Sequence, residues 1–164
     1  MDNQQAKTTD IEIGWVAGFA DGEGSFCFRR REGKRKPLID CHVPVFCINN
    51  CHIPSLNHLT EILEKAGLTY WVYWRRKNHP KHSTQWNVTI SGLKRIKPFL
   101  LWLTPYLFTK QKQAEALIDF INLRESKPYN APYGDEEFQL VNRTRILNSP
   151  KNASTTTRTT SVIR

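Results

Sequence analysis

The sequence predicts a mixed α+β domain with one antiparallel sheet that is buried on one face and polar on the other. Helical and alternating apolar patterns follow one another as helix, hairpin, helix, hairpin and then further helices. The 164 residues, 39% hydrophobic and 24% charged, suffice for one globular unit with a buried core. We expect one domain over residues 10–148, after a polar extension over 1–9 and before a polar, flexible tail over 149–164.

The first expected helix opens with a capping box and contains many small residues. Thr9 is followed three residues later by Glu12, which is typical of a helix start. The helix should run to about Asp21. Gly18 lies inside it, where glycine costs about 1 kcal/mol relative to alanine. Close approach of another backbone would explain this glycine.

The first hairpin has an aromatic face and a basic face. Its strands are expected at residues 25–31 and 38–49. Because side chains alternate along a strand, Phe26 and Phe28 share one face. The opposite face carries Arg29 and Arg31. Pro44 has no N–H to donate, so it indicates a bulge or an edge position in the second strand.

The second hairpin also has two unlike faces. Its strands are expected at residues 69–77 and 84–91. Apolar and polar residues alternate in the second strand, which is a half-buried pattern. We assign to the polar face Tyr73, Arg75, Lys77, Gln85, Asn87 and Thr89. A shift of one residue in the first strand would place Val72, Trp74 and Arg76 there instead.

Four further helices follow from the helical spacing of apolar residues. They are expected at residues 55–66, 93–103, 110–123 and 136–147. Pro98 should fix the start of the second of these helices or a kink in it.

The net charge of +9 is concentrated in the two hairpins. Ten of the 24 basic residues lie in two windows of eight residues, at 29–36 and 75–82. Positive charge focused in this way suits a polyanion, and nucleic acid is the commonest polyanion in cells. The alternative is that the hairpin tips are basic only for solubility.

The cysteines and the absence of a long apolar run indicate an intracellular protein. No run reaches the roughly 18 residues that cross a bilayer, and the sequence does not open like a signal peptide. We expect a prokaryotic cytoplasm or an organelle, no membrane partner, and reduced thiols at Cys27, Cys41, Cys47 and Cys51. A disulfide set is one alternative. Another is a zinc site formed by Cys47, Cys51, His52 and either His79 or His82.

The end of the first helix carries two acids where the helix dipole is already negative. Asp21 and Glu23 are unfavourable there unless a cation lies nearby. A divalent metal would suit, with the Glu23 carboxylate and a free carbonyl such as that of Gly22 as ligands. A carboxylate in solvent, or beside a hairpin arginine, is the alternative.

Two lysines lie at the start of the expected helix 110–123, where their positive charge is unfavourable beside the positive end of the helix dipole. Lys110 and Lys112 lie where helix N–H groups attract anions. A docked phosphate would stabilise both, unless they only extend into water. A metal carboxylate, a phosphate site and basic hairpins together indicate metal-assisted phosphodiester hydrolysis.

Two motifs resemble those of the LAGLIDADG homing endonucleases. The first, from Val16 to Gly24, reads VAGFADGEG and is followed at once by a strand-like run. The second, from Leu103 to Gln113, reads LTPYLFTKQKQ and is similar to the family's Pro-containing turn and Lys-Gln helix start. The resemblance covers roughly residues 10–125 and implies an αββαββα-type fold with an antiparallel DNA-binding sheet.

The single motif implies a homodimer, because single-motif members of the family pair through their motif helices. The resemblance places Trp15, Gly18, Phe19 and Asp21 at that dimer interface. It also implies Mg²⁺ bound by Glu23 and the Gly22 carbonyl, with Ca²⁺ or Mn²⁺ able to substitute.

The resemblance further implies catalytic roles for Glu23, Lys110 and Asn50. Lys110 matches the family's basic residue near the scissile phosphate, and Asn50 stands where the family has a water-positioning glutamine. The arginine expected shortly afterwards has no counterpart, and His52 is the nearest candidate. The sequence therefore departs from the family at the residues that would order water around the phosphate.

Two protomers would bind double-stranded DNA with the polar faces of their sheets. A strand of about ten residues spans roughly 30 Å, or about nine base pairs, so a dimer covers around 20 base pairs. The expected DNA-binding residues are Arg29, Arg31, Lys34, Arg35, Lys36, Cys47, Tyr73, Arg75, Lys77, Gln85, Asn87, Thr89 and Lys112.

We therefore expect an intron-encoded, Mg²⁺-dependent, site-specific DNA endonuclease that cuts one phosphodiester per strand at a long pseudo-palindromic site. One alternative is a non-cleaving intron RNA maturase or DNA-binding protein on the same fold. A protein-interaction module with basic hairpins is the other.

Overall fold

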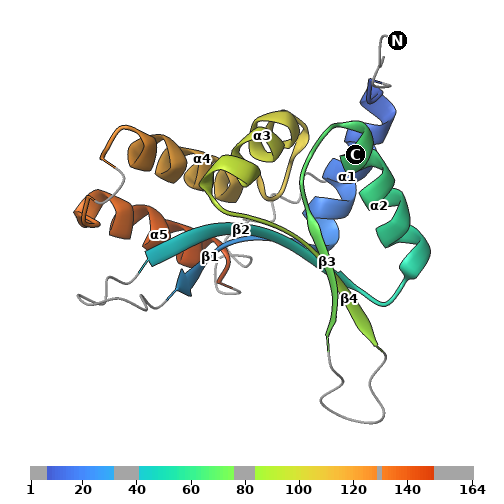
Figure 1. Cartoon of the computed structure of the whole chain (residues 1–164), viewed down its shortest axis with the longest axis horizontal. Coiled ribbons are helices and arrows are strands. Elements are labelled where there is room, and N and C mark those ends of the chain that lie inside the picture. Colours follow the sequence, from blue (N-terminus) through green and yellow to red (C-terminus); the bar gives the residue numbers. More distant parts are fainter. Residues whose placement is uncertain (1–6, 32–40, 76–83, 129–130, 150–164) are drawn as a thin grey trace, which may run out of the picture.

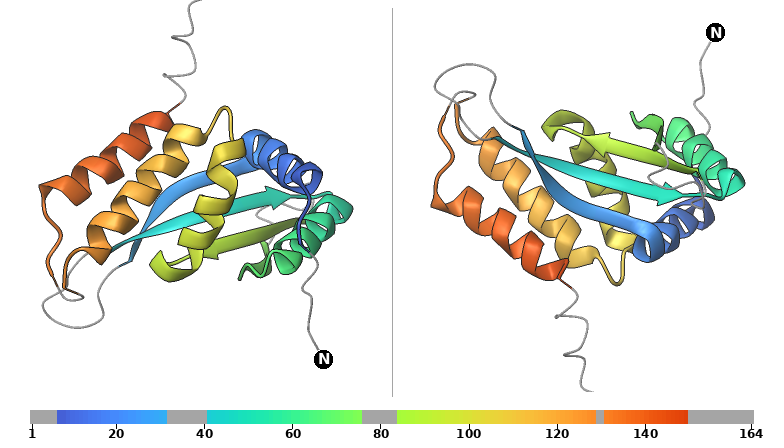
Figure 2. Two further views of the ribbon diagram at one scale, coloured as in Figure 1. Left: turned by 90° about the horizontal axis from the view of Figure 1, so that it is seen from above. Right: turned by 90° about the horizontal axis from the view of Figure 1, so that it is seen from below.

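Helices gather on one side of a sheet, and the other side of the sheet stays open (Figure 1, Figure 2). The computed structural model describes residues 7–31, 41–75, 84–128 and 131–149. The elements over these residues are α1 (Asp10–Glu23), β1 (Gly24–Arg31), β2 (Cys41–Asn50), α2 (Ile53–Lys65), β3 (Trp71–Arg75), β4 (Gln85–Ser91), α3 (Leu93–Leu103), the 3₁₀ helix η1 (Thr104–Tyr106), α4 (Gln111–Glu125) and α5 (Asp135–Leu147). The predicted α+β fold is confirmed. Most of the expected extension over 1–9 and tail over 149–164 lies outside the described residues.

The strands pair antiparallel in the order β1-β2-β4-β3. The β1–β2 ladder runs without a bulge from Gly24 opposite Ile48 to Arg31 opposite Cys41. Pairing of β2 with β4 begins only at Val45, and just beyond it the Pro44 carbonyl accepts a hydrogen bond from the Gly92 N–H over 3.2 Å. Pro44 therefore lies at the end of the β2–β4 ladder, an edge-like position where a missing N–H is tolerated, and the ladder with β1 has no bulge there.

The register of the second hairpin decides which residues share the open face. Tyr73 lies opposite Asn87, and Asn87 lies opposite Asn49 of β2. Arg75 occupies the position opposite Gln85. The preferred assignment of Tyr73 and Arg75 to the face of Asn87 is therefore confirmed, and the one-residue shift is excluded.

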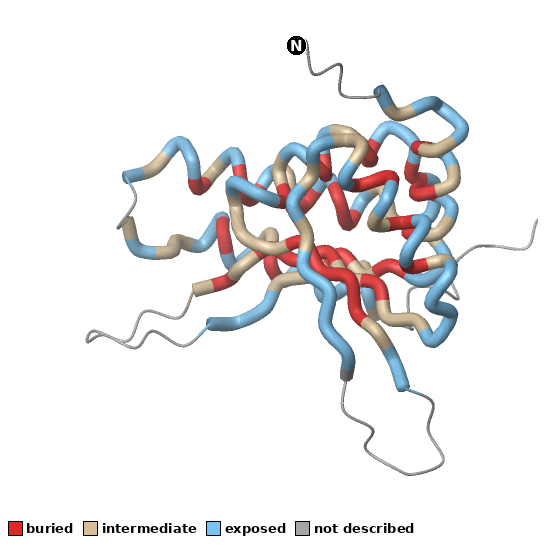
Figure 3. The backbone as a smooth tube through the Cα atoms, turned by 45° about the vertical axis from the view of Figure 1, so that its right-hand side comes forward, coloured by how far each residue is buried: buried red, intermediate tan, exposed pale blue. Residues whose placement is uncertain are grey.

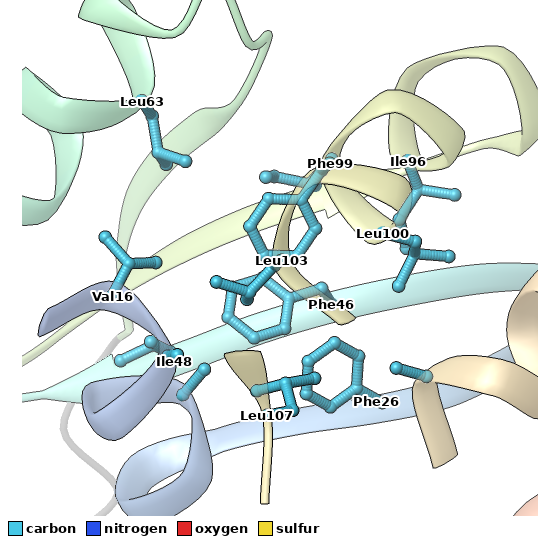
Figure 4. Close-up of a cluster of buried hydrophobic side chains, with 14 of the residues drawn as sticks. Val16, Phe26, Phe46, Ile48, Leu63, Ile96, Phe99, Leu100, Leu103 and Leu107 are labelled. Atoms are coloured by element: carbon cyan, nitrogen blue, oxygen red, sulfur yellow. The ribbon is translucent and has the colours of Figure 1, made fainter. Parts of the chain in front are cut away.

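The apolar core lies between the sheet and the helices (Figure 4). The rings of Phe26 and Phe46 have centroids 4.9 Å apart, and Phe99 of α3 lies 4.5 Å from Phe46. All three are fully buried. Burial of each such side chain contributes about 1.5–3 kcal/mol, so this cluster holds α3 on the sheet. Val16 of α1 and Leu63 of α2 extend the same core.

The strand β3, at one edge of the sheet, is exposed, whereas the middle of the sheet is buried (Figure 3). Trp71, Val72, Tyr73 and Trp74 are all exposed. Val72 also borders a shallow apolar hollow between the sheet and α2, where it meets Ile53.

The predicted capping box at the start of α1 is confirmed. The Thr9 N–H donates to Glu12 Oε2 over 2.7 Å, and the Glu12 N–H donates to Thr9 Oγ1 over 3.2 Å. Lys65 Nζ of α2 lies 2.8 Å from Glu12 Oε1. Hydrogen bonds from Lys65 and Thr9 lower the pKa of Glu12 to about 2. The cap therefore also ties α1 to α2.

Several helix boundaries differ from expectation, whereas α3 covers the expected residues. Helix α1 continues to Glu23, two residues further than expected. Helix α2 begins earlier, at Ile53, because His52 caps it and accepts a hydrogen bond from the Ser55 N–H. Helix α3 begins at Leu93 and runs through Pro98, so the proline does not fix its start. None of the described helices combines the length and apolarity that a membrane span requires.

A buried ion pair joins α4 to α5. Arg124 Nη1 of α4 lies 3.0 Å from Glu137 Oε1 of α5, and the Glu137 side chain is fully buried. Lys127 Nζ approaches the same oxygen at 2.8 Å, and the Gly134 N–H donates to Glu137 Oε2 over 2.9 Å. Burial alone would raise the pKa of Glu137, but these hydrogen bonds outweigh it and lower the pKa to about 2.

We predict that Glu137→Gln lowers the free energy of unfolding by about 3 kcal/mol at pH 7, because it leaves buried Arg124 without a counter-charge. The folded-state pKa lies below the unfolded value of about 4.3, so the ionised form of Glu137 stabilises the fold above that value. This contribution is lost as the pH falls toward about 2.

Urea denaturation of wild type and variant from pH 7 to pH 2 checks this prediction. The difference between their free energies of unfolding should decrease as the pH falls. Glu136→Gln is the matched control, because the Glu136 side chain is 73% exposed. Equal losses in the two variants would contradict the role of the buried pair.

Candidate functional site

The Asp21 carboxylate at the end of α1 closes the turn that leads into α4. Asp21 Oδ2 accepts from the Phe108 N–H over 2.7 Å. Asp21 Oδ1 accepts from the N–H groups of Thr109 and Lys110 over 3.1 and 2.9 Å, and from the Thr109 hydroxyl over 2.9 Å. The anion that we expected at the start of this helix is therefore the chain's own carboxylate.

The Lys110 side chain makes the reciprocal contact, from the start of α4 back to the end of α1. Its ammonium group donates to the carbonyl oxygens of Ala20, Gly22 and Gly24 over 3.1, 3.5 and 2.5 Å. Carbonyls at the end of a helix have no partner within the helix and carry partial negative charge. The cation that we expected at the end of α1 is therefore Lys110. Its extension into water is excluded, whereas Lys112 is exposed.

These contacts shift both titrating groups. Burial opposes ionisation of Asp21, but hydrogen bonds from the backbone of Phe108, Lys110 and Thr109 outweigh it and hold its pKa below the usual range. Burial lowers the pKa of Lys110, and the carboxylates of Asp21 and Glu23 partly counteract that effect. An ionised carboxylate and an ammonium group therefore lie at one short junction of α1, β1 and α4.

The junction depends on a glycine at position 24. A Cβ atom there would lie 2.6 Å from the Ala20 carbonyl oxygen and 2.8 Å from Phe46 Cε2. The Gly24 N–H also donates to the Ala20 carbonyl, which ends α1. Only glycine lets the chain pass from helix to strand this close to the core.

Glu23 and Gly22 lie at the same helix end and face outward. Both are exposed, and the Glu23 carboxylate is near enough to raise the pKa of Lys110. Within the described residues, no three His, Cys, Asp or Glu side chains gather as a metal cluster. One protomer therefore offers a metal the Glu23 carboxylate and the carbonyl group of Gly22, but not a full set of side-chain ligands.

The expected zinc site is not formed by its described members. Cys51 is exposed, and His52 uses its ring to cap α2, with Nδ1 2.8 Å from Ser55 Oγ. Cys47 lies on the sheet, and none of the four cysteines is part of a disulfide. His79 and His82 lie outside the described residues.

Asn50 lies near the end of α1 but holds a local turn. Gly24 pairs with Ile48, so the end of β2 lies beside the end of α1. Asn50 Oδ1 accepts from the His52 N–H over 2.8 Å. The carboxamide oxygen that would orient water is therefore used in the turn between β2 and α2.

The open face of the sheet carries two arginines of the first hairpin, Arg29 and Arg31. Arg29 and Arg31 are exposed, opposite Val43 and Cys41. Lys34, Arg35, Lys36 and Lys77 lie outside the described residues. Tyr73 and Gln85 are exposed on the same face.

Two of the expected DNA-binding residues on this face are buried and hydrogen-bonded to each other. Asn87 and Thr89 are 5% and 4% exposed. The Thr89 hydroxyl donates to Asn87 Oδ1, and Asn87 Nδ2 donates to Asn49 Oδ1. The period-two pattern located these side chains correctly but did not show that they bond to one another. They lie on the expected face, but they are buried within it.

A pair of thiols lies between the arginines and this polar chain. Cys47 is opposite Ser25, two positions from Cys27 on the neighbouring strand. A hydrogen bond from Cys47, opposed by burial and aided by Ser25 and Arg29, lowers the pKa of Cys27 to about 6. Cys47 thus contacts Cys27 on the face where we expected it to contact DNA.

The exposed side of α1 is lined by glycines. Gly14, Gly18 and Gly22 are exposed and follow one another at intervals of four residues. A Cβ atom on any of them would meet nothing within 4 Å in the described chain. Gly18 therefore has no packing reason inside one protomer.

Trp15 and Phe19 pack against the core, whereas Gly18 is exposed. Their rings are 5.1 Å apart, and Trp15 stacks edge-on against His58 of α2 at 4.6 Å. Both are half-buried against the protomer's own core. The exposed side of α1 instead continues to Ile11, which is 86% exposed, and sequence reasoning missed this residue.

This fold is similar to that of solved homing endonucleases. I-CvuI in complex with its target, in the presence of Ca, matches with a TM-score of 0.64 and 18% identity, over 85% of this chain and 83% of that chain. The archaeal intron-encoded I-Vdi141I, complexed with DNA, gives 0.66 and 15%, over 86% of each chain. The LAGLIDADG homing endonuclease I-SmaMI, bound to cleaved DNA, gives 0.58 and 18%, over 83% of this chain and 42% of that chain.

The likeness to LAGLIDADG homing endonucleases that the two motifs indicate is thus confirmed at the level of the fold. No family model and no curated protein sequence matches the chain.

We predict that Asp21→Asn lowers the free energy of unfolding by about 1–2 kcal/mol, because an amide NH₂ cannot accept the hydrogen bonds that the second carboxylate oxygen receives. Glu23→Gln is the control, since Glu23 is exposed two residues away. It should change stability by less than about 0.5 kcal/mol. Chemical denaturation at pH 7 measures both, and equal effects would show that Asp21 does not hold the turn.

Proposed function

We propose that this chain is a site-specific double-stranded DNA endonuclease that acts as an intracellular, intron-encoded homodimer and uses Mg²⁺ to hydrolyse one phosphodiester bond in each strand. One observation carries the proposal. An exposed carboxylate, Glu23, and an ammonium group, Lys110, lie near each other where α1 enters a sheet whose other face is open and basic. A carboxylate for metal and a cation for phosphate are the groups that phosphodiester hydrolysis requires.

The residues present fit a divalent metal. The carbonyls of Ala20, Gly22 and Gly24 already converge on a cation, the Lys110 ammonium group. Glu23 and the Gly22 carbonyl would hold the metal, and hard oxygen ligands of this kind suit Mg²⁺ and Ca²⁺. When bound, such a metal activates water and stabilises the leaving oxygen. The remaining ligands would come from a second protomer, from DNA and from water.

The sheet would hold the DNA. β2 has ten residues, which span roughly 33 Å, or about ten base pairs of duplex. Arg29 and Arg31 are exposed along β1 and can contact phosphates or guanine edges. Lys110 would neutralise charge at the scissile phosphate. I-CvuI and I-Vdi141I were both solved with bound DNA or target, which supports a nucleic-acid ligand for this fold.

Dimerisation through α1 would bring two such sites together. Gly14, Gly18 and Gly22 leave a smooth helix side that a second copy could approach closely. Ile11 would bury its exposed side chain at the same contact. The two Glu23 carboxylates would then lie near the two-fold axis, each able to serve one DNA strand.

A specific observation supports a second candidate, a non-cleaving RNA or DNA binder on the same fold. The Asn50 carboxamide oxygen and the His52 ring are both committed to the turn before α2. A water network that depended on Asn50 or His52 would then lack free groups. Such a protein would select nucleic-acid sites from a randomised library without cutting any.

We predict that Glu23→Gln abolishes cleavage and preserves DNA binding. A randomised target library first supplies a site that the wild type cuts with Mg²⁺. On that site the variant should cut at least about 10²–10³-fold more slowly, because a metal-binding carboxylate has been removed. Its affinity in Ca²⁺, measured by fluorescence anisotropy, should stay within a few fold.

Glu115→Gln, an exposed acid on α4, is the control for this variant. Cleavage by Glu23→Gln at the wild-type rate would refute the proposed mechanism.

We predict that Gly18→Leu converts a dimer into a monomer of 19.1 kDa, because a leucine would separate the two α1 helices. Folding should be retained, since space is free at this position within the protomer. Sedimentation velocity at micromolar concentration measures the change, and Gln139→Leu on exposed α5 serves as control. A wild type that sediments only at 19.1 kDa would refute the dimer.

A further inference from the structure

The Lys110 ammonium group lies at the helix end where the metal of the proposed function would bind. Three carbonyl oxygens surround it, and one of them belongs to Gly22, the proposed metal ligand. Lys110 is half-buried, and the two nearest carboxylates, Asp21 and Glu23, both attract it. The ammonium group therefore uses one of the two proposed metal ligands, the Gly22 carbonyl, and lies within electrostatic reach of the other, the Glu23 carboxylate.

This arrangement is held independently of the Lys110 side chain. The Lys110 N–H, together with those of Phe108 and Thr109, is fixed by the Asp21 carboxylate. The backbone at position 110 is thereby anchored to the end of α1 by contacts that do not involve the side chain. The ammonium group can leave the carbonyls without opening the junction.

We propose that Lys110 is a stand-in cation for the metal, so that binding of a divalent ion displaces its ammonium group from the end of α1. The inference rests on the proposed function, because it takes Glu23 and the Gly22 carbonyl as the metal ligands. The physical reason is electrostatic: a divalent ion and an ammonium group repel each other when they share one set of oxygens. Asp21 is then the positioning residue that keeps Lys110 beside the site when its side chain is released.

This exchange would give metal binding a second consequence besides water activation. The released ammonium group would be free to contact a DNA phosphate. The Lys110 ammonium group would thus be hydrogen-bonded to the carbonyls in the metal-free protein. It would become available to a DNA phosphate only when the metal is bound. Its storage also offsets the charge of the α1 end, where Asp21 and Glu23 lie against the helix dipole.

Calcium binding to the full-length protein without DNA tests the inference by calorimetry. Lys110→Met should bind Ca²⁺ roughly tenfold more tightly than the wild type, a coupling of the size usual between two linked events. Lys112→Met removes the same charge from an exposed position on the same helix and should leave the Ca²⁺ affinity unchanged. Equal or weaker binding by Lys110→Met overturns the inference, as does the absence of Ca²⁺ binding to both proteins.

A measurement on the wild type covers the case in which Lys110→Met does not fold. The side-chain NH₃⁺ resonance of Lys110, assigned by NMR, should be protected from exchange in EDTA and should shift and lose protection when Ca²⁺ is added. An unchanged resonance under saturating Ca²⁺ overturns the inference. The proposed function fails separately, because a protein could show this exchange and still cut no DNA in the library assay.

Discussion

The reciprocal contact between Asp21 and Lys110 is the interaction on which the arrangement of this site depends. The carboxylate takes the N–H groups of the turn before α4, and the ammonium group takes the carbonyls at the end of α1. Each helix end carries charge that is unfavourable on its own, and each supplies the group that the other needs. Two segments almost ninety positions apart in the sequence are joined in this way, and the exposed Glu23 is left free beside them.

Because this junction lies where α1 turns into β1, it also fixes the site relative to the sheet. Gly24 allows no side chain between the helix end and Phe46, so the first strand begins directly against the core. The helices cover one face, and Arg29 and Arg31 remain on the other. A chemical group at the end of α1 and a basic surface along β1 therefore belong to one rigid connection rather than to separate loops.

Much of this fold follows from local patterns. The capping box at Thr9, the alternation of Trp86, Val88 and Ile90, and the edge position of Pro44 each depend on neighbouring residues and were predictable. The sequence also showed both charge anomalies, at Asp21 and at Lys110. It could not show that each of these side chains contacts the helix end of the other, because that contact depends on the tertiary structure. The same limit applies to Asn87 and Thr89, whose periodicity indicates a polar face but not their mutual hydrogen bonds.

The glycines of α1 lower the stability of this helix. Within the protomer, Trp15 and Phe19 stabilise the attachment of α1, while Gly14, Gly18 and Gly22 contribute no packing and weaken the helix. A helix that keeps three such residues on one exposed side is less stable alone than an alanine helix would be. A second helix packed on that side would recover the loss through close backbone contact. In the proposed homodimer, the weakness of α1 as an isolated element, its bare side and its acidic end would all follow from one requirement, that two copies of this helix end meet at the same place.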